Sequence, residues 1–178
     1  MYTIQRHLQF NAWADGKMVE MLTNVDEKLF DQEVKSSFPS LRKTVMHIWD
    51  AEQVWFLRIK GIPFSGWPGN NFKGNTQEML NGYVDNSKAL AEFMLPKDRA
   101  FFDTQLNYKN MQNLEYTQPI EDILFHVVNH ASFHRGQLIT MMRELGLNKF
   151  TNTDLITYMR LQTNQQVSPP NSLISNQQ

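Results

Sequence analysis

The sequence predicts an all-α fold, an up-and-down four-helix bundle with a small β-hairpin and a short C-terminal helix. Four long segments carry apolar residues at the 3.6-residue spacing of an amphipathic helix. The length of 178 residues suits one domain with a substantial core. Aromatic residues make up 12% of the chain, and such bulky side chains need an interior to fill. No internal repeat is visible, so we expect a single bundle with room for one long crossover connection.

The first helix is expected over residues 3–23, with Asp15 and Gly16 as a weak point inside it. One face of this segment carries the apolar residues Ile4, Leu8, Val19 and Leu22. Residues 25–40 are expected to form a connector with one short helical turn. The connector ends at Ser40, a residue type that commonly caps the N-terminus of a helix.

The second helix is expected over residues 41–60, ended by Gly61 and Pro63. Its apolar residues are Leu41, Val45, Ile48, Trp49, Trp55, Phe56 and Ile59. They cover more than half of the helix circumference, which predicts a central position in the bundle. Residues 61–75 are rich in glycine, proline and asparagine and are expected to form a loop.

The third helix is expected to be capped by Thr76 and to end at Pro96. Its predicted buried side consists of Met79, Leu80, Tyr83, Leu90 and Phe93. Residues 100–116 change to a period of two, which predicts a small β-hairpin. The alternating residues are Phe102, Thr104, Leu106 and Tyr108.

The fourth long helix is expected to start at Pro119 and to reach Leu145, with Gly146 just beyond its C-terminus. Residues 153–162 are expected to add a short helix. The bundle domain is therefore assigned to residues 1–162. Residues 163–178 lack charge and are poor in large apolar groups, so we expect a flexible tail.

The composition excludes several classes of function. The formal net charge is -1, which argues against a nucleic-acid-binding surface. The chain has no cysteine, so it can form neither a disulfide nor a thiolate metal site. No apolar run approaches the roughly 20 residues that span a bilayer. We therefore expect a cytoplasmic protein without a membrane or nucleic-acid partner.

The fourth helix carries a row of histidines at intervals of four residues, His126, His130 and His134. Two histidines four apart leave the same face of a helix and can chelate one cation. Three in a row diverge, because each step of four residues turns the side chain by roughly 40°. On the helical wheel His134 lies nearest the centre of the aliphatic stripe, His130 next and His126 farthest away. A metal site inside the bundle should therefore use His130 and His134.

A third ligand would come from another helix. His47 on the second helix is the first candidate and His7 on the first helix is the alternative. Neutral imidazole suits zinc, nickel, copper or iron. The competing interpretation is that these histidines are hydrogen-bonded core groups or surface residues, and spacing alone leaves the two interpretations about equal.

Several polar residues near the histidines have two interpretations each. Asp50 is either an acceptor for an imidazole N–H or an ordinary surface acid. Glu52 falls within the aliphatic stripe, where it could pair with Arg58 or Arg135. Arg135 could instead hold a substrate carboxylate. The loop aromatics either form a rim over the site or cap the core; they are Phe64, Trp67 and Phe72.

Four sequence pieces together resemble the DinB/YfiT-like superfamily of metal-binding bundle proteins. In chain order they are FNAWADGKMVEML, SSFPSLRKTVMHIWDAEQVWFLRIKG, HVVNHASFHRGQL and TDLITYMR. The resemblance covers nearly all of residues 1–162 and implies a four-helix bundle with a three-histidine metal site. The ligands that it implies are His47, His130 and His134, the last two being those that the helical wheel selects.

The resemblance also implies a range of functions. Members include thiol S-transferases that use low-molecular-weight thiols and proteins similar to metal-dependent hydrolases or isomerases, and many members are dimers. The expectation is a metal-dependent enzyme that binds a divalent ion, zinc or nickel above all, and acts on a small molecule. The alternative is a non-catalytic, metal-stabilised binding or stress protein, and a homodimer is expected in either case.

Overall fold

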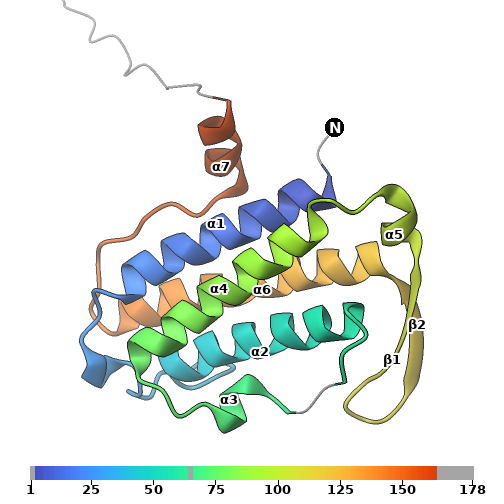
Figure 1. The fold of residues 1–178 in the computed structure, drawn as a ribbon. Helices are drawn as coiled ribbons and strands as arrows, with labels where there is room; N and C mark the ends of the chain where they lie inside the picture. The colour runs from blue at the N-terminus through green and yellow to red at the C-terminus, as the bar shows by residue number, and fades with distance from the viewer. Residues whose placement is uncertain (1–2, 64–65, 164–178) are drawn as a thin grey trace, which may run out of the picture.

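Four long helices form the molecule's body in the computed structural model, which describes residues 3–63 and 66–163 (Figure 1). They are α1 (Ile4–Leu22), α2 (Leu41–Ile59), α4 (Thr76–Met94) and α6 (Ile120–Glu144). All four lie where the apolar spacing predicts them, with ends that differ by one or two residues. Among the described helices, none combines the length and apolar composition that a membrane span requires.

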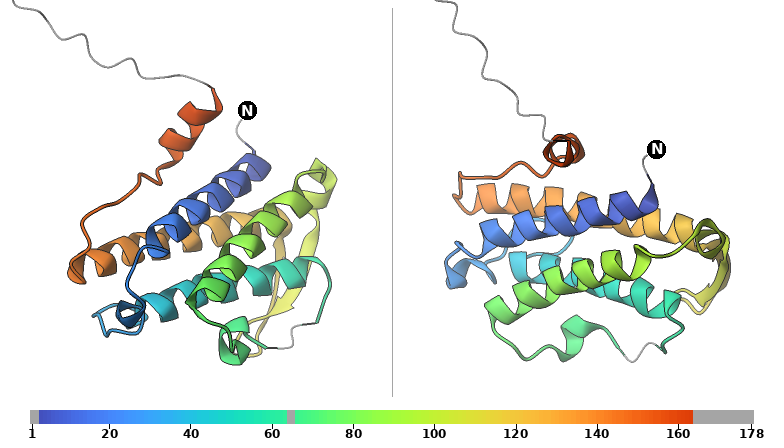
Figure 2. Two further views of the ribbon diagram at one scale, coloured as in Figure 1. Left: turned by 60° about the vertical axis from the view of Figure 1, so that its left-hand side comes forward. Right: turned by 45° about the horizontal axis from the view of Figure 1, so that its top comes forward.

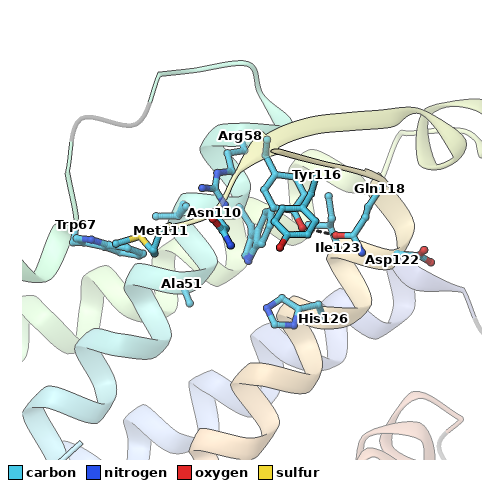
Figure 3. Close-up of a pocket in the computed structure, with 13 residues that line it drawn as sticks. Ala51, Arg58, Trp67, Asn110, Met111, Tyr116, Gln118, Asp122, Ile123 and His126 are labelled. Carbon is cyan, nitrogen blue, oxygen red and sulfur yellow. Dashed lines mark hydrogen bonds between the residues drawn. The ribbon is translucent and has the colours of Figure 1, made fainter. Parts of the chain in front are cut away.

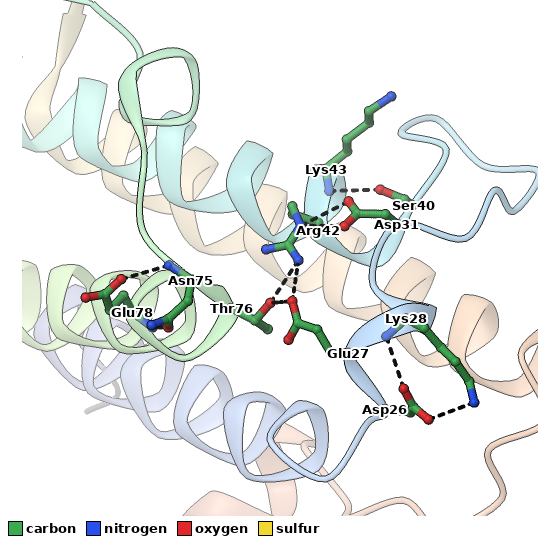
Figure 4. Close-up of polar contacts among 10 residues, drawn as sticks. All are labelled: Asp26, Glu27, Lys28, Asp31, Ser40, Arg42, Lys43, Asn75, Thr76 and Glu78. Atoms are coloured by element: carbon green, nitrogen blue, oxygen red, sulfur yellow. Dashed lines mark hydrogen bonds and ion pairs between the residues drawn. The ribbon is translucent and has the colours of Figure 1, made fainter.

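Polar side chains cap the helix ends. Ser40 accepts a hydrogen bond from the backbone N–H of Lys43, which confirms it as the N-cap of α2. The N-cap of α4 is Asn75 and not Thr76: Asn75 and Glu78 form a capping box in which each side chain accepts from the other residue's backbone N–H. Thr76 is the first helical residue, and its hydroxyl bonds to Glu27 and Arg42 (Figure 4).

The helices are ordered α1, α4, α2, α6 around the bundle, so α1 and α2, which are consecutive in the chain, occupy opposite corners (Figure 2). Contacts between α2 and α4 advance together along both helices, from Arg42–Thr76 through Glu52–Asn86 to Phe56–Phe93, so these two run parallel. The expected crossover is therefore the connection over residues 60–75. The chain runs in the same direction before and after it, so the up-and-down alternation is broken at this one step. Contacts between α2 and α6 move forward along α2 but backward along α6, from Thr44–Met141 through His47–His130 to Trp55–His126. These two helices are therefore antiparallel.

The shorter elements connect and cover the bundle. The expected helical turn is η1 (Glu27–Leu29), and the expected C-terminal helix is α7 (Leu155–Gln162). The hairpin is confirmed as β1 (Gln105–Lys109) paired antiparallel with β2 (Glu115–Pro119). Two short helices were not predicted, α3 (Pro68–Asn71) and α5 (Arg99–Asp103). The expected mobile tail beyond Thr163 lies outside the described residues.

The alternating pattern at 100–116 therefore has two origins. Phe102 belongs to α5, where Asp98 caps the first turn, and its side chain is buried in the core. Thr104 follows as the C-cap, and the strand begins only at Gln105. A single helical turn can place its one buried apolar residue where the alternation of a following strand would also place one. The sequence pattern therefore did not distinguish α5 from the strand.

A polar network lies in the centre of the core, where the weak point in α1 was expected. Asp15 is completely buried and pairs with Arg135 of α6, with 2.6 Å between Oδ1 and Nη1. Asn11 donates to Asp15 and to Glu52 of α2 at 3.0 and 2.9 Å. Ser87 of α4 donates to Asp15 at 2.7 Å. The network joins all four long helices, so Asp15 does not interrupt α1 but links it to its neighbours.

Candidate metal centre

Three histidine side chains meet between the antiparallel helices α2 and α6. His47 comes from α2, and His130 and His134 come from consecutive turns of α6. The Nε2 atoms of His47 and His130 are 2.9 Å apart, and the three ring centroids are 4.4 to 4.8 Å from one another. One nitrogen of each ring lies within 4.8 Å of one nitrogen of the others. The structure thus brings together the three residues predicted as ligands.

The donor set fits a single divalent ion. Zinc–imidazole bonds are about 2.0–2.1 Å long, so two imidazole nitrogens on one ion lie roughly 3 to 3.5 Å apart. The 2.9 Å between His47 and His130 is at the short end of this range, and the limit of 4.8 Å for the other pairs is within reach of small ring rotations. Among the described residues no fourth histidine or acid joins the group, which leaves coordination positions for exogenous ligands.

A hydrogen-bond chain fixes the orientation of His134. Its Nδ1 lies 2.7 Å from Oε1 of Gln137, and the amide nitrogen of Gln137 donates to Oγ of Ser37 at 3.0 Å. Since the Gln137 oxygen can only accept, Nδ1 of His134 carries the proton and its Nε2 is left with a free lone pair. Such a partner on the second ring nitrogen is typical of histidines that bind metals. Gln137 follows His134 by three residues, so the two side chains lie on the same side of α6, but this spacing alone does not show the hydrogen bond.

The surroundings keep the imidazoles neutral. Burial, together with the nearby His134, lowers the pKa of His47 to about 4. Burial and the neighbouring histidines lower the pKa of His130 to about 3. Burial also lowers the pKa of His134, although its bond to Gln137 opposes the shift. All three rings are therefore neutral near pH 7, with one ring nitrogen free of a proton, and this is the state in which imidazole binds a metal.

The ring of Phe38 covers one side of this group. It stacks on His47 with 3.9 Å between ring centroids and meets His134 edge-on at 5.7 Å. His134 is buried, whereas His47 and His130 are half-buried. The group is therefore shielded on the Phe38 side, while His47 and His130 each keep part of their surface exposed to solvent.

The other two histidines lie outside the group. His126 is exposed, and its ring is 5.8 Å from that of His130 and 6.0 Å from that of Trp55. His7 lies against the rings of Phe10 and Phe125, so the alternative third ligand from the first helix is not supported. Burial decreases from His134 through His130 to His126, as the helical wheel predicts.

The polar residues expected near the site take other roles. Asp50 accepts from the backbone N–H of Gly69 at 2.8 Å and so anchors α3, a role that neither expectation included. Arg135 forms the interhelical salt bridge with Asp15, and its burial excludes contact with a substrate. Glu52 is buried as expected, but it bonds to Asn11 and not directly to Arg135. Burial and the neighbouring Asp15 carboxylate raise the pKa of Glu52 well above its usual range.

A cavity of about 490 Å³ lies between α2, α6 and the hairpin, about one helical turn along α2 and α6 from the three histidines, which do not line it themselves (Figure 3). Trp67 and His126 line it, as do Trp55 and Arg58 of α2. Of the two loop aromatics that the structure describes, Trp67 thus lies at a candidate site. Phe72 instead packs edge-on against Trp49 beside the core, and Phe64 lies outside the described residues.

Comparison with known proteins is consistent with this geometry. The sequence profile of the DinB family matches residues 1–169. This chain belongs to the DinB family. It is 24% identical to the protein DinB of Bacillus subtilis (strain 168) over 145 residues, which cover 78% of this chain and 83% of that protein.

Solved structures of DinB-like proteins share the fold. One from Bacillus cereus superposes with a TM-score of 0.62 at 22% identity, covering 80% of this chain and 92% of the other. YfiT from Bacillus subtilis gives a TM-score of 0.63 at 11% identity, covering 82% of this chain and 89% of YfiT. YfiT is described as a probable metal-dependent hydrolase with an unusual four-helix bundle topology. YjoA from the same species gives a TM-score of 0.62 at 13% identity, covering 84% and 97% of the two chains.

Proposed function

We propose that this DinB-family protein is a metal-dependent enzyme that acts on a small organic molecule. His47, His130 and His134 would hold one divalent ion, zinc or nickel, and the reaction would be a hydrolysis or an S-transfer from a low-molecular-weight thiol. The observation that carries the proposal is the meeting of three neutral imidazoles, with one nitrogen from each within 4.8 Å, beside a cavity of about 490 Å³. The description of the similar protein YfiT as a probable metal-dependent hydrolase supports it.

Three protein ligands are typical of catalytic sites, because structural zinc sites usually have four. A divalent ion at such a site supplies Lewis-acid chemistry and lowers the pKa of a water or thiol that it binds, so that a nucleophile exists near pH 7. Since the chain has no cysteine, a reacting thiol would have to come from a second small molecule.

The chain's own residues prepare the site. Gln137 holds His134 with its Nδ1 protonated and its Nε2 available. Phe38 stacks on His47 and limits the access of water from that side. Glu52 is sealed in the core and Asp50 is bonded to Gly69, so neither acid of α2 is placed to serve as a general base at the histidines.

A non-catalytic, metal-stabilised binding protein would be favoured by a sealed site or by a fourth protein ligand. His47 and His130 are half-buried, and the described residues provide no fourth ligand, so the arrangement favours catalysis. The homodimer that the family resemblance implies remains a prediction, as does the choice between zinc and nickel.

Turnover by metal-loaded protein tests the proposal. Tag-free protein loaded with zinc or with nickel would be assayed with p-nitrophenyl acetate for hydrolysis. Monochlorobimane with glutathione, cysteine or coenzyme A would serve for S-transfer. The expected result is metal-dependent turnover in one assay, lost in His47→Ala and retained in the matched control His7→Ala. If the wild type binds the metal and is stabilised by it, yet turns over none of a wider panel of esters and thiols, the binding-protein alternative replaces the enzyme.

A further inference from the structure

We propose that the cavity beside the three histidines binds the uncharged, aromatic part of the substrate, while the substrate's metal-binding group reaches His47, His130 and His134. The substrate class would be a planar aromatic compound that carries such a group or reacts beside it. This inference rests on the proposed function, because it assumes an ion on the three histidines.

The cavity and the histidines share two helix faces. Ala51 lines the cavity one helical turn after His47 on α2, and His126 lines it one turn before His130 on α6. Because α2 and α6 are antiparallel, both steps lead in the same direction along the groove between them. Figure 3 shows Ala51 and His126 on the two facing helices at the edge of the cavity. A ligand bound there therefore needs to extend only about one helical turn, roughly 5.4 Å, to reach the histidines.

Aromatic rings form much of the cavity wall. They belong to Trp55, Trp67, Tyr108 and Tyr116, and the larger apolar side chains among the rest are Val54, Met111 and Ile123. Trp55 meets Tyr108 edge-on at 4.8 Å, and Tyr108 stacks on Tyr116 with an interplanar angle of 22°. Aromatic walls favour a planar partner through stacked and edge-on contacts. A volume of about 490 Å³ is within the range of pockets that hold small molecules.

The charges at the cavity balance. Its described lining residues carry one fixed positive charge, on Arg58, and one fixed negative charge, on Asp122. The guanidinium of Arg58 donates to the carbonyl of Lys109 at 2.7 Å and lies 4.7 Å from the ring centre of Trp55. Arg58 is therefore held as part of the wall, and burial lowers its pKa. A pocket with no net charge and an engaged arginine favours an uncharged ligand body over an anion.

The mouth of the cavity carries an exposed apolar side chain. Met111, in the hairpin turn, is 76% exposed although it lines the cavity, and it lies beside Trp67 in Figure 3. A flexible thioether can adapt to ligands of different shape and makes favourable contacts with aromatic rings. Ligand binding would cover this apolar surface, so Met111 gives a test position whose substitution leaves the core untouched.

Two hydroxamates, which bind metals through the same head group, separate the cavity from the ion. Benzohydroxamic acid carries an aromatic ring and acetohydroxamic acid only a methyl group. Their dissociation constants would be measured by calorimetry on zinc-loaded wild type, Ala51→Trp and Met111→Ala, with zinc content determined for each. The surface substitution Ala89→Trp on α4 is the matched control for the added indole.

The expected result is that wild type and Ala89→Trp bind benzohydroxamate at least ten-fold more tightly than acetohydroxamate. In Ala51→Trp this ratio should fall to near one while acetohydroxamate still binds. Met111→Ala, which keeps the core intact, should reduce the ratio two- to five-fold and so tests the cavity even if Ala51→Trp does not fold. A ratio near one in wild type, with both compounds binding, overturns the cavity proposal and leaves the proposed function standing. If zinc is bound but neither hydroxamate binds, the site is closed to ligands and both proposals fail.

Discussion

Gln137→Leu should weaken zinc binding without unfolding the protein. Gln137 accepts a hydrogen bond from His134 Nδ1 at 2.7 Å and is itself held by Ser37 at 3.0 Å. Leucine has a similar size but no acceptor, so the ring of His134 loses its fixed orientation and tautomer. Removal of such a partner typically costs 10- to 100-fold in metal affinity. This corresponds to about 1.4 to 2.8 kcal/mol of binding free energy.

The assay is a competition titration of zinc between the protein and a chromophoric chelator at pH 7.5. Gln137→Glu is the informative opposite change, because a carboxylate is a stronger acceptor and should preserve or increase affinity. Ser37→Ala removes only the far end of the chain and should cost less than Gln137→Leu. A Gln137→Leu protein that binds zinc within three-fold of wild type would refute the role assigned to this hydrogen bond.

Three further predictions concern stability and pH. Arg135→Met should lower the free energy of unfolding by about 3–5 kcal/mol in urea titrations, because it leaves the completely buried Asp15 without its cation. Zinc affinity should fall less than about ten-fold between pH 7.5 and 5.5, because the lowered pKa values of the histidines keep protons from competing with zinc until the pH falls below those values. Three ordinary histidines of pKa about 6.5 would instead lose roughly 1000-fold in zinc affinity over the same range. Gly82→Ala should lower the free energy of unfolding by about 1–3 kcal/mol, because the added Cβ would lie 2.3 Å from the indole of Trp49. Gly136→Ala should instead raise it by about 0.5–1 kcal/mol, because the added Cβ would have no atom within 4 Å and alanine favours the helical conformation of α6.

Each of these predictions has an outcome that contradicts it. If Arg135→Met lowered the free energy of unfolding by less than about 1 kcal/mol, the Arg135–Asp15 pair would contribute no more than a surface salt bridge. A fall of zinc affinity of about 1000-fold between pH 7.5 and 5.5 would show that the imidazoles titrate as ordinary histidines. If the alanine variants of Gly82 and Gly136 were equally stable, the close approach of α2 and α4 at Trp49 would not be real.

Periodicity predicted the four long helices and the two metal-ligand candidates on α6, because burial against neighbours imposes the 3.6-residue spacing directly. It did not predict α3 or α5, each of which is too short to show a period. Asp15 and Gly16 resemble a break because the sequence does not show that Arg135, 120 positions away, compensates the buried charge. Likewise, the sequence does not show that Asn75 and not Thr76 is the N-cap, because both are residue types that cap helices. The reciprocal bond to Glu78 is what distinguishes them, and it is a property of geometry.

The third ligand shows where sequence reasoning depended on family resemblance. The helical wheel left His47 and His7 open as partners for His130 and His134. Which of them meets α6 at the level of these residues depends on the parallel or antiparallel pairing of the helices. α2 runs antiparallel to α6 and brings His47 to the pair, whereas His7 lies against Phe125 and farther along the bundle. No local pattern encodes that arrangement.

The central claim is that three of the chain's five histidines hold one ion. Replacing each of the five histidines in turn by alanine tests this claim most directly. Metal content would be measured by elemental mass spectrometry on tag-free protein after incubation with zinc or nickel and gel filtration. The prediction is about one ion per chain in wild type, His7→Ala and His126→Ala, and less than about a tenth of that in His47→Ala, His130→Ala and His134→Ala. Metal-free wild type, or an ion retained by His47→Ala and lost from His126→Ala, would contradict the three-histidine site.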